Sequence, residues 1–314
     1  MKIATIGTGG IGGYLAVKLT LNGHEVAAVA RGAHLSAIQK NGLTLATMEG
    51  VENIRPWKAS NDTKSIGPVD AIIFGVKCNA LDQAAKACLP MLHNETIVVP
   101  FLNGVEAPER LSKFLPKQNI ANGIAKISTT IAQPGIIRQV GSFAQFIFSE
   151  CDNKPSLRIK QLQSIFRNSG IDAPETEDID CDLWSKFVLF SSMSGVTAAA
   201  RCTVGDIRSS EELSNLAQAI MIETANVGRA KGIKLPNTLE KDLWTSIETL
   251  PADMRASTAI DLENNRPLET PWVSGAAVRL AREAGVSAKL NEAIFALLSP
   301  FEKGAKRSDS DSSC

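Results

Sequence analysis

Short, nearly continuous apolar runs recur along the first hundred residues of the chain, at 2–6, 24–30, 70–76 and 96–101. The segments between them, such as 81–92, mix apolar and polar positions at helical spacing. Strands that are apolar on both faces are typical of a parallel sheet covered by helices on each side. The pattern therefore predicts an α/β domain with a doubly wound, Rossmann-type sheet.

Two longer β-rich runs follow, at 125–132 and 135–149. The turn sequence Gln133-Pro134-Gly135 joins them, which predicts a hairpin-like extension of the sheet. The spacing then predicts a helix over 156–169 and a last short strand or crossover over 171–174.

From residue 179 onward the apolar positions recur at helical spacing. The last predicted helix has Thr270 as its N-cap and Pro271 as its first residue, a combination typical of helix starts. Helices are predicted over 183–200, 211–231, 251–265 and 271–284.

The chain length of 314 residues is about twice that of a typical domain. We expect the change of pattern to separate a Rossmann-type domain over 1–178 from an all-helical domain over 179–302. The polar, small-residue tail over 303–314 is predicted to be disordered.

The composition excludes several functional classes. Lys plus Arg and Asp plus Glu number 33 each, so no net charge favours nucleic acid or an anionic membrane surface. Neither a membrane-spanning apolar run nor a signal-peptide pattern is present. The six cysteines are scattered without a CxxC pair, and there are only three histidines, which argues against a disulfide scaffold or a zinc site. We expect a soluble cytoplasmic protein.

A glycine pattern directly follows the first apolar run. Gly7, Gly9 and Gly12 form the GxGxxG spacing between a predicted strand and a predicted helix. In this context the first glycine permits a tight turn, the second lets a pyrophosphate approach the backbone, and the third allows close packing of helix on strand. We therefore expect residues 7–12, including Gly10 and Ile11, to bind a dinucleotide; a glycine-rich turn without a ligand is the alternative.

The residue after the second apolar run indicates which dinucleotide binds. NAD-binding units carry Asp or Glu about 20 residues beyond the glycines, where it holds the ribose hydroxyls. Here that place holds Arg31. A guanidinium pairs well with a 2′-phosphate, which favours NADP (NADPH) over NAD. An ordinary exposed arginine is the alternative.

Two further polar residues follow predicted strands of the same sheet. Lys77 comes after the run that ends at residue 76, and Asn103 comes shortly after Phe101. Ligands of parallel sheets bind at the carboxyl ends of the strands, so Lys77 and Asn103 are candidates for contact with the dinucleotide. A solvated lysine and a simple Asn-Gly turn are the alternatives.

Several stretches of the chain have amino-acid sequences typical of one family, and they occur in the order typical of it. They are KIATIGTGGIGGYLA, VARGAHLSAIQKNGL, FGVKCNAL, FLNGVE, PGIIRQVG, DLWSKF and ETPWVSG. On these stretches the chain resembles the ketopantoate reductase (2-dehydropantoate 2-reductase) family over nearly its whole length. The resemblance implies a Rossmann domain, a helical domain and a substrate cleft between them. It also implies NADPH-dependent reduction of ketopantoate to pantoate on the route to coenzyme A.

The resemblance also implies roles for individual residues. Lys186 matches the catalytic lysine that protonates the carbonyl oxygen as hydride arrives. Glu269 matches the acidic residue that works with it, and Ser257 matches a serine that contacts the substrate carboxylate. Asn103 and Lys77 match positions near the nicotinamide and the substrate. From the residues alone, Lys186 could pair with Asp182, and Glu269 could favour the N-terminus of the next helix.

The chain departs from the family at the residues that would contact substrate. Asparagines are typical four and eight residues after the lysine, but here those places hold Phe190 and Ser194. Met254 replaces another expected asparagine. Each lost polar contact should weaken binding of a hydroxylated acid by roughly 1–3 kcal/mol. Glu223 also has apolar neighbours at helical spacing and is expected to face inward, toward the cleft.

Three functions remain open at this point. The first is an NADPH-dependent ketopantoate reductase, and the second is a related oxidoreductase for a bulkier or more apolar 2-oxo acid. The third is a protein that senses NADP(H) without turnover, which Lys186 and Glu269 disfavour because a sensor needs no proton donor. A homodimer is an open alternative to a monomer.

Overall fold

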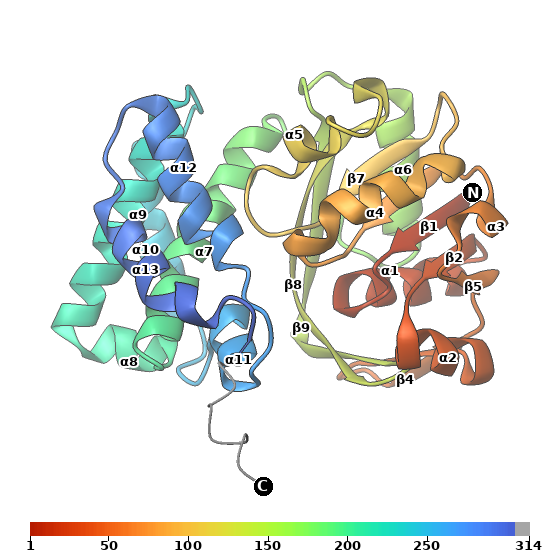
Figure 1. Cartoon of the computed structure of the whole chain (residues 1–314), viewed down its shortest axis with the longest axis horizontal. Coiled ribbons are helices and arrows are strands. Elements are labelled where there is room, and N and C mark those ends of the chain that lie inside the picture. The colour runs from red at the N-terminus through yellow and green to blue at the C-terminus, as the bar shows by residue number, and fades with distance from the viewer. Residues whose placement is uncertain (305–314) are drawn as a thin grey trace, which may run out of the picture. The chain divides into compact units, whose positions relative to one another are not determined.

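The computed structural model describes residues 1–304, which divide into two compact units (Figure 1). The first unit comprises Met1–Leu102 and Glu106–Ile179. The second comprises Asn103–Val105 and the chain from Asp180 onward. The predicted fold class is confirmed: an α/β unit with a parallel sheet is followed along the chain by a helical unit. Most of the tail predicted to be disordered, residues 305–314, lies outside the described residues.

The first unit contains the predicted parallel sheet, in the strand order β5-β2-β1-β6-β7. Nearly every residue of its four apolar strands is buried, as expected for a sheet covered on both faces. The strands are β1 (Lys2–Ile6), β2 (Glu25–Val29), β5 (Lys58–Ser60), β6 (Ala71–Phe74) and β7 (Ile97–Pro100). The helices of this unit are α1 (Gly10–Leu21), α2 (Gly32–Asn41), α3 (Thr63–Ile66), α4 (Leu81–Cys88), α5 (Ala107–Leu111) and α6 (Leu157–Asn168), with short 3₁₀ turns η1 (Cys78–Ala80), η2 (Leu89–Met91) and η3 (Lys117–Asn119).

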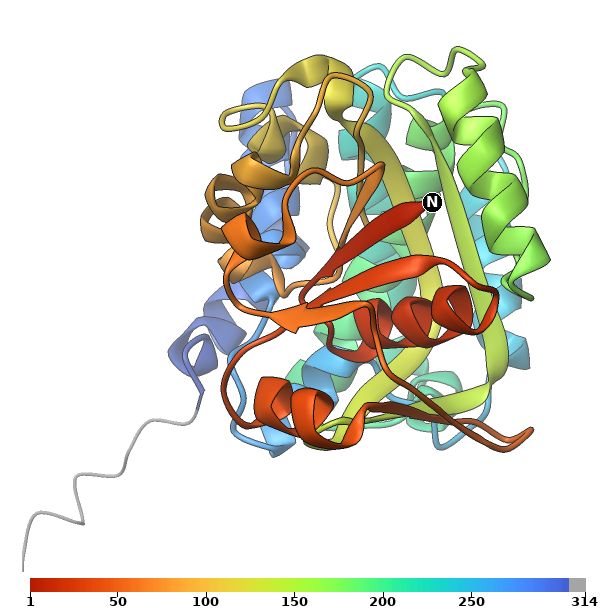
Figure 2. The ribbon, with the colours of Figure 1, turned by 90° about the vertical axis from the view of Figure 1, so that its right-hand side faces the viewer.

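A second sheet, in the order β4-β3-β9-β8, lies on the other side of α1 (Figure 2). Its strands are β3 (Leu43–Ala46), β4 (Val51–Ile54), β8 (Ala121–Gln133) and β9 (Ile136–Glu150). The predicted hairpin is confirmed as the antiparallel β8–β9 pair, but the prediction that it extends the parallel sheet was wrong. β9 pairs instead with β3, because both long strands pack against the small residues at the start of α1.

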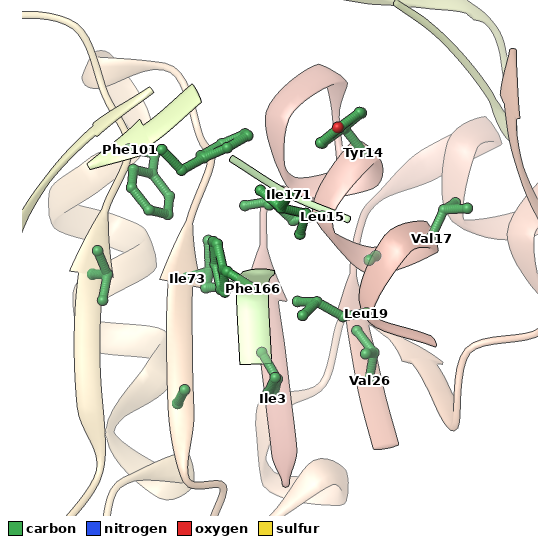
Figure 3. Packing of buried hydrophobic residues seen from close by; sticks show 14 of the residues in the cluster. Ile3, Tyr14, Leu15, Val17, Leu19, Val26, Ile73, Phe101, Phe166 and Ile171 are labelled. Atoms are coloured by element: carbon green, nitrogen blue, oxygen red, sulfur yellow. The ribbon is translucent and has the colours of Figure 1, made fainter. Parts of the chain in front are cut away.

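The core of this unit joins the two sheets to α1 and α6. Figure 3 shows Leu15 of α1, Ile73 of β6 and Phe166 of α6 among the residues that pack there. Phe166 makes an edge contact with Phe148 of β9, with ring centroids 5.1 Å apart. Of the short strand or crossover predicted over 171–174, the structure has a connecting segment with one isolated bridge, between Gln145 and Asp172.

The second unit is helical and packs around α7, whose buried residues contribute to two apolar clusters. Its helices are α7 (Ile179–Ala199), α8 (Val204–Ser209), α9 (Glu211–Ala230), α10 (Leu239–Thr249), α11 (Ser257–Glu263), α12 (Ser274–Ala284) and α13 (Lys289–Leu298), with 3₁₀ turns η4 (Thr270–Trp272) and η5 (Ser299–Phe301). Across residues 1–304, every helix is too short or too polar to cross a bilayer.

Three helix starts in the second unit differ from prediction, and the first is that of α7, which begins at Ile179 rather than at 183. Thr270 and Pro271 do not begin an α-helix; they form η4, and α12 starts only at Ser274. α11 begins at Ser257 rather than near 251, because the preceding segment bonds to another element. There the carbonyl of Met254 accepts the N–H of Val204, at the start of α8.

Candidate active site

Packing shapes the glycine-rich turn at two of the three glycines of the GxGxxG spacing. Gly7 has φ +80°, and a Cβ there would lie 2.6 Å from Val76 Cγ1. A Cβ on Gly12 would overlap the carbonyl oxygen of Gly7. At Gly9, by contrast, the nearest neighbour of a Cβ would be Ile131 Cδ1 at 3.7 Å, an ordinary contact. The protein itself therefore requires glycine at 7 and 12, whereas glycine at 9 leaves space at the surface of the turn.

The first turn of α1 fits a phosphate group. The N–H groups that open a helix have no acceptor inside it, and they carry the positive end of the helix dipole. Gly9 is the N-cap of α1, and no acidic side chain stands in the first turn. Gly10, Ile11 and Gly12 thus present backbone donors beside the space left at Gly9. This combination is suited to holding the pyrophosphate of a dinucleotide.

Arg31 and Lys77 lie at the same edge of the parallel sheet as the glycine-rich turn. The register pairs Ile6 with Val29 and with Phe74, so the chain leaves all three strands at one edge. Arg31 is the exposed N-cap of α2, and its Nη1 donates to Gln83 Oε1 at 3.3 Å. Lys77, also exposed, is the N-cap of η1. Both cations thus lie at the sheet edge where the glycine-rich turn begins.

Three residues that the sequence analysis did not single out also shape this site. Thr129 Oγ1 would lie 2.6 Å from a Cβ on Gly10, and Ile131 Cδ1 would lie 3.7 Å from a Cβ on Gly9. The ring of His34 contacts the backbone of the turn through Thr8. The contacts of Thr129 and Ile131 are set by the position of β8 against α1, for which the local sequence carries no signal.

In the second unit, Lys186, Asn103 and Glu269 form a hydrogen-bonded chain. Lys186 Nζ donates to Asn103 Oδ1 at 3.3 Å, and Asn103 Nδ2 donates to Glu269 Oε2 at 3.0 Å. An ammonium can only donate and a carboxylate can only accept, so the amide orientation suits both partners. Lys186 and Asn103 are half-buried, and Glu269 is 7% exposed. The result is a cation held in place by a neutral amide and a buried carboxylate.

Asn103 reaches this cluster because of its neighbour. Gly104 has φ +82°, and a Cβ there would lie 2.5 Å from the carbonyl oxygen of Trp272 in η4. This close approach brings the segment after β7 against the turn that follows Glu269. Asn103-Gly104 is therefore more than a simple turn, and Asn103–Val105 packs with the second unit rather than the first.

Phe190 and Ser194 continue the helix face that carries Lys186. Phe190 is half-buried against the apolar cluster of this unit. Ser194 is 2% exposed, and its Oγ lies 2.6 Å from Thr258 Oγ1 in the first turn of α11. Ser257 is the exposed first residue of that helix. This hydrogen bond links α7 to the first turn of α11, directly beside Ser257.

Glu223 caps a neighbouring helix. Its carboxylate accepts the backbone N–H groups of Leu290 and Asn291, at 3.0 and 2.8 Å, and the side-chain amide of Asn291. The N-cap of α13 is Ala288, which has no side chain that could cap the helix. Glu223 of α9 supplies the missing acceptor, so its position is explained by helix capping.

Residues 1–304 contain no group of three His, Cys, Asp or Glu side chains that could hold a metal ion.

Comparison with known proteins identifies the family. The model described as ketopantoate reductase PanE/ApbA matches residues 3–153, and its C-terminal counterpart matches 178–302. The chain belongs to the ketopantoate reductase family. The fold and the Lys186–Asn103–Glu269 cluster are thus found in a member of this family.

Relatives match almost the whole chain at modest identity. A 2-dehydropantoate 2-reductase of Mesorhizobium japonicum is 28% identical, covering 95% of this chain and 97% of its own. An uncharacterized oxidoreductase of Bacillus subtilis, YkpB, is 25% identical, covering 96% and 99%.

Several solved structures share the fold of this chain. A PanE/ApbA family ketopantoate reductase from Ralstonia eutropha has a TM-score of 0.88 and 29% identity, covering 96% of this chain and 98% of its own. A D-mandelate dehydrogenase, solved with NADH and anilino(oxo)acetate, has a TM-score of 0.89 over 96% and 98% of the two chains. At 21% identity, the latter likeness concerns the fold alone.

Proposed function

We propose that this protein uses NADPH to reduce a 2-oxo acid to the 2-hydroxy acid, and that its substrate is 2-dehydropantoate. The proposal rests on the hydrogen bonds that connect Lys186, Asn103 and Glu269. The amide of Asn103 orients the Lys186 ammonium, and the buried carboxylate of Glu269 holds the amide. The names of several relatives support the same substrate. On this proposal the protein acts in the cytoplasm, in the synthesis of pantothenate.

The cluster can supply the proton that carbonyl reduction needs. A nicotinamide dinucleotide at the glycine-rich turn would supply the hydride that the carbonyl carbon accepts. Lys186 donates a hydrogen bond to the carbonyl oxygen, stabilises the negative charge that develops there, and then transfers its proton. Asn103 orients Lys186 through its Oδ1, and Glu269 fixes the amide through its Nδ2. The lysine regains its proton from water after the product leaves.

Arg31 is the basis for proposing NADPH rather than NADH. A guanidinium at the end of the second strand can bind a 2′-phosphate with charge-assisted hydrogen bonds. Gln83 accepts from Arg31 and so limits the positions that the guanidinium adopts. A carboxylate at the same place would instead favour the ribose hydroxyls of NADH.

A second candidate substrate is a bulkier or more apolar 2-oxo acid. Phe190 stands one helical turn from Lys186, and the Ser194 hydroxyl bonds to Thr258. Polar side chains that would hold a hydroxylated acid are therefore fewer on this helix face than the family pattern predicts. Ser257 remains as the proposed contact for the carboxylate, which every 2-oxo acid carries.

A steady-state assay tests the proposal. Purified protein is given NADPH with 2-dehydropantoate, 3-methyl-2-oxobutanoate or phenylglyoxylate, and NADPH oxidation is followed by absorbance. We expect the highest kcat/KM with 2-dehydropantoate. Preference for phenylglyoxylate would favour the second candidate. Tight NADPH binding without turnover of any acid would contradict both and favour a sensor of NADP(H).

A further inference from the structure

His34, in the first turn of α2, joins two segments that lie far apart in the sequence. Its Nε2 lies 2.7 Å from the carbonyl oxygen of Thr8, inside the glycine-rich turn. Its Nδ1 accepts the backbone N–H of Gly135, in the turn between β8 and β9, at 3.0 Å. The imidazole is half-buried between these two backbone groups.

The partners of the ring fix its tautomer. A backbone N–H can only donate, so Nδ1 must carry a lone pair toward Gly135. The proton of the neutral ring is then on Nε2, which donates to the Thr8 carbonyl. This neutral form satisfies both backbone partners with one side chain.

The bond to Thr8 sets the direction of the next N–H group. The N–H of Thr8 donates to the carbonyl of Val29 at 3.1 Å, and its hydroxyl lies 3.1 Å from the carbonyl oxygens of both Val29 and Thr5. His34 holds the remaining polar group of Thr8, its carbonyl. In a planar trans peptide the C=O and the following N–H point in opposite directions. The N–H of Gly9 therefore points out of the turn on the side away from His34.

We propose that His34 is a positioning residue for dinucleotide binding, acting by fixing the Thr8–Gly9 peptide so that the Gly9 N–H faces the phosphate. This inference rests on the proposed function, because it assumes that the turn binds a dinucleotide. His34 itself stands on the opposite side of the peptide from the proposed phosphate. Its contribution is to remove the freedom of one peptide unit before the ligand arrives.

The other end of the contact is rigid, as a positioning role requires. Gly135 is buried, has φ +80°, and would place a Cβ 3.0 Å from Ala37 Cβ on α2. Its carbonyl accepts the N–H of Thr44 in β3 at 2.9 Å. His34 thus connects the glycine-rich turn to a segment that is already packed against α2 and paired with β3.

Two substitutions separate the two hydrogen bonds of His34. In His34→Gln the side-chain amide nitrogen reaches the place of Nε2 and can still donate to Thr8. In His34→Asn the amide oxygen reaches the place of Nδ1, accepts from Gly135 and leaves the Thr8 carbonyl without its donor. Dissociation constants for NADPH are measured by calorimetry, together with melting temperatures and steady-state constants.

We expect His34→Asn, which loses the hydrogen bond to Thr8, to raise the Kd for NADPH about tenfold. His34→Gln keeps that hydrogen bond and should raise the Kd less than about threefold. Both variants should keep kcat at saturating NADPH and the KM for the oxo acid, because neither constant depends on the Thr8–Gly9 peptide. A purely structural role would instead lower the melting temperature of both variants and leave their NADPH affinities equal.

Equal Kd values for His34→Asn and the wild type, or equal losses in the two variants, would overturn the inference. The proposed function fails differently. If the wild-type protein binds NADPH but reduces no oxo acid, the reductase proposal is overturned, while the comparison of Kd values still decides the role of His34. A wild-type protein that binds no dinucleotide would overturn both.

Discussion

The glycine-rich turn and the Lys186–Asn103–Glu269 cluster are built in opposite ways. The turn is one contiguous segment whose donors are backbone N–H groups, and its shape depends on the absence of side chains. The cluster is assembled from side chains of three segments, with Asn103 83 residues from Lys186 and 166 from Glu269. A site made of backbone should be damaged by adding one carbon atom. A site made of side chains should be damaged by removing a polar group, with little change in the fold.

The largest expected effect on stability distinguishes two glycines of the turn. Gly12→Ala should destabilise the protein by about 3 kcal/mol, because its Cβ overlaps the Gly7 carbonyl inside a packed region. Gly9→Ala should leave the free energy of unfolding within about 0.5 kcal/mol of wild type but raise the Kd for NADPH at least tenfold, because the added methyl fills the ligand space. Urea unfolding and calorimetry measure the two quantities. Equal destabilisation by both substitutions would contradict the assignment of Gly9 to the ligand.

Tyr14, the only tyrosine, reports on the packing of α1 in the same variants. Burial raises its pKa above the ordinary value of 10.0, with smaller contributions from Glu49 and Glu52. Its ring stacks on Phe146 of β9. We expect the pKa, measured by absorbance titration, to fall toward 10.0 in Gly12→Ala and to stay raised in Gly9→Ala.

The cluster is expected to lose turnover rather than stability. Glu269→Gln keeps an acceptor for the amide of Asn103 and should lower kcat about tenfold. Glu269→Ala leaves that N–H without its acceptor, so Lys186 loses its orientation and kcat should fall about a hundredfold. NADPH affinity should be unchanged in both. Similar kcat values for Gln and Ala would mean that Glu269 acts by its charge rather than through Asn103.

Arg31 tests the cofactor preference. Arg31→Gln should raise the Kd for NADPH about tenfold or more, the effect of losing a charge-assisted hydrogen bond, and leave the Kd for NADH unchanged. Lys77→Gln removes a cation from the same sheet edge and is the comparison, because without a contact to the 2′-phosphate it should change the Kd values for NADPH and NADH by the same factor. Equal losses for NADPH and NADH in Arg31→Gln would exclude a contact with the 2′-phosphate.

The smallest expected effect concerns the attachment of α11. Ser194→Ala removes the hydrogen bond to Thr258 and should raise the KM for the oxo acid a few-fold, at a cost of about 1 kcal/mol in stability. Ser192→Ala is the control, because its buried hydroxyl bonds to Ala217 of α9 instead. It should cost similar stability and leave KM unchanged. A raised KM in both variants would show that general loosening, not α11, is responsible.

The contrast between the two regions also explains what the sequence could predict. The strand, the glycines and the helix of the turn are adjacent in the chain, so their spacing alone predicts the local structure. The separate β4-β3-β9-β8 sheet was missed, since the apolar pattern of β8 and β9 identifies strands but not their partners. α13 was missed for a related reason. Its first turn is capped by Glu223, 67 residues away, so the local sequence has no start signal.

Neither periodicity nor composition predicts that the residues of the cluster lie close together in the fold. Lys186 and Glu269 were singled out by resemblance to the family, and Asn103 also by its place after a strand. Their contact depends on Gly104 packing against Trp272, a tertiary arrangement with no local signature. The hydrogen bond between Ser194 and Thr258 could not be predicted for the same reason, because the two residues are 64 positions apart in the sequence.

The most direct test of the account is NADPH oxidation with 2-dehydropantoate by the wild type, Lys186→Ala and Lys186→Arg. We predict that kcat falls about a thousandfold in Lys186→Ala, while the Kd for NADPH and the melting temperature remain close to wild type. Lys186→Arg should also be slow, because a guanidinium donates a hydrogen bond but does not release its proton. Turnover by Lys186→Ala within about tenfold of wild type would contradict the assignment of Lys186 as the proton donor.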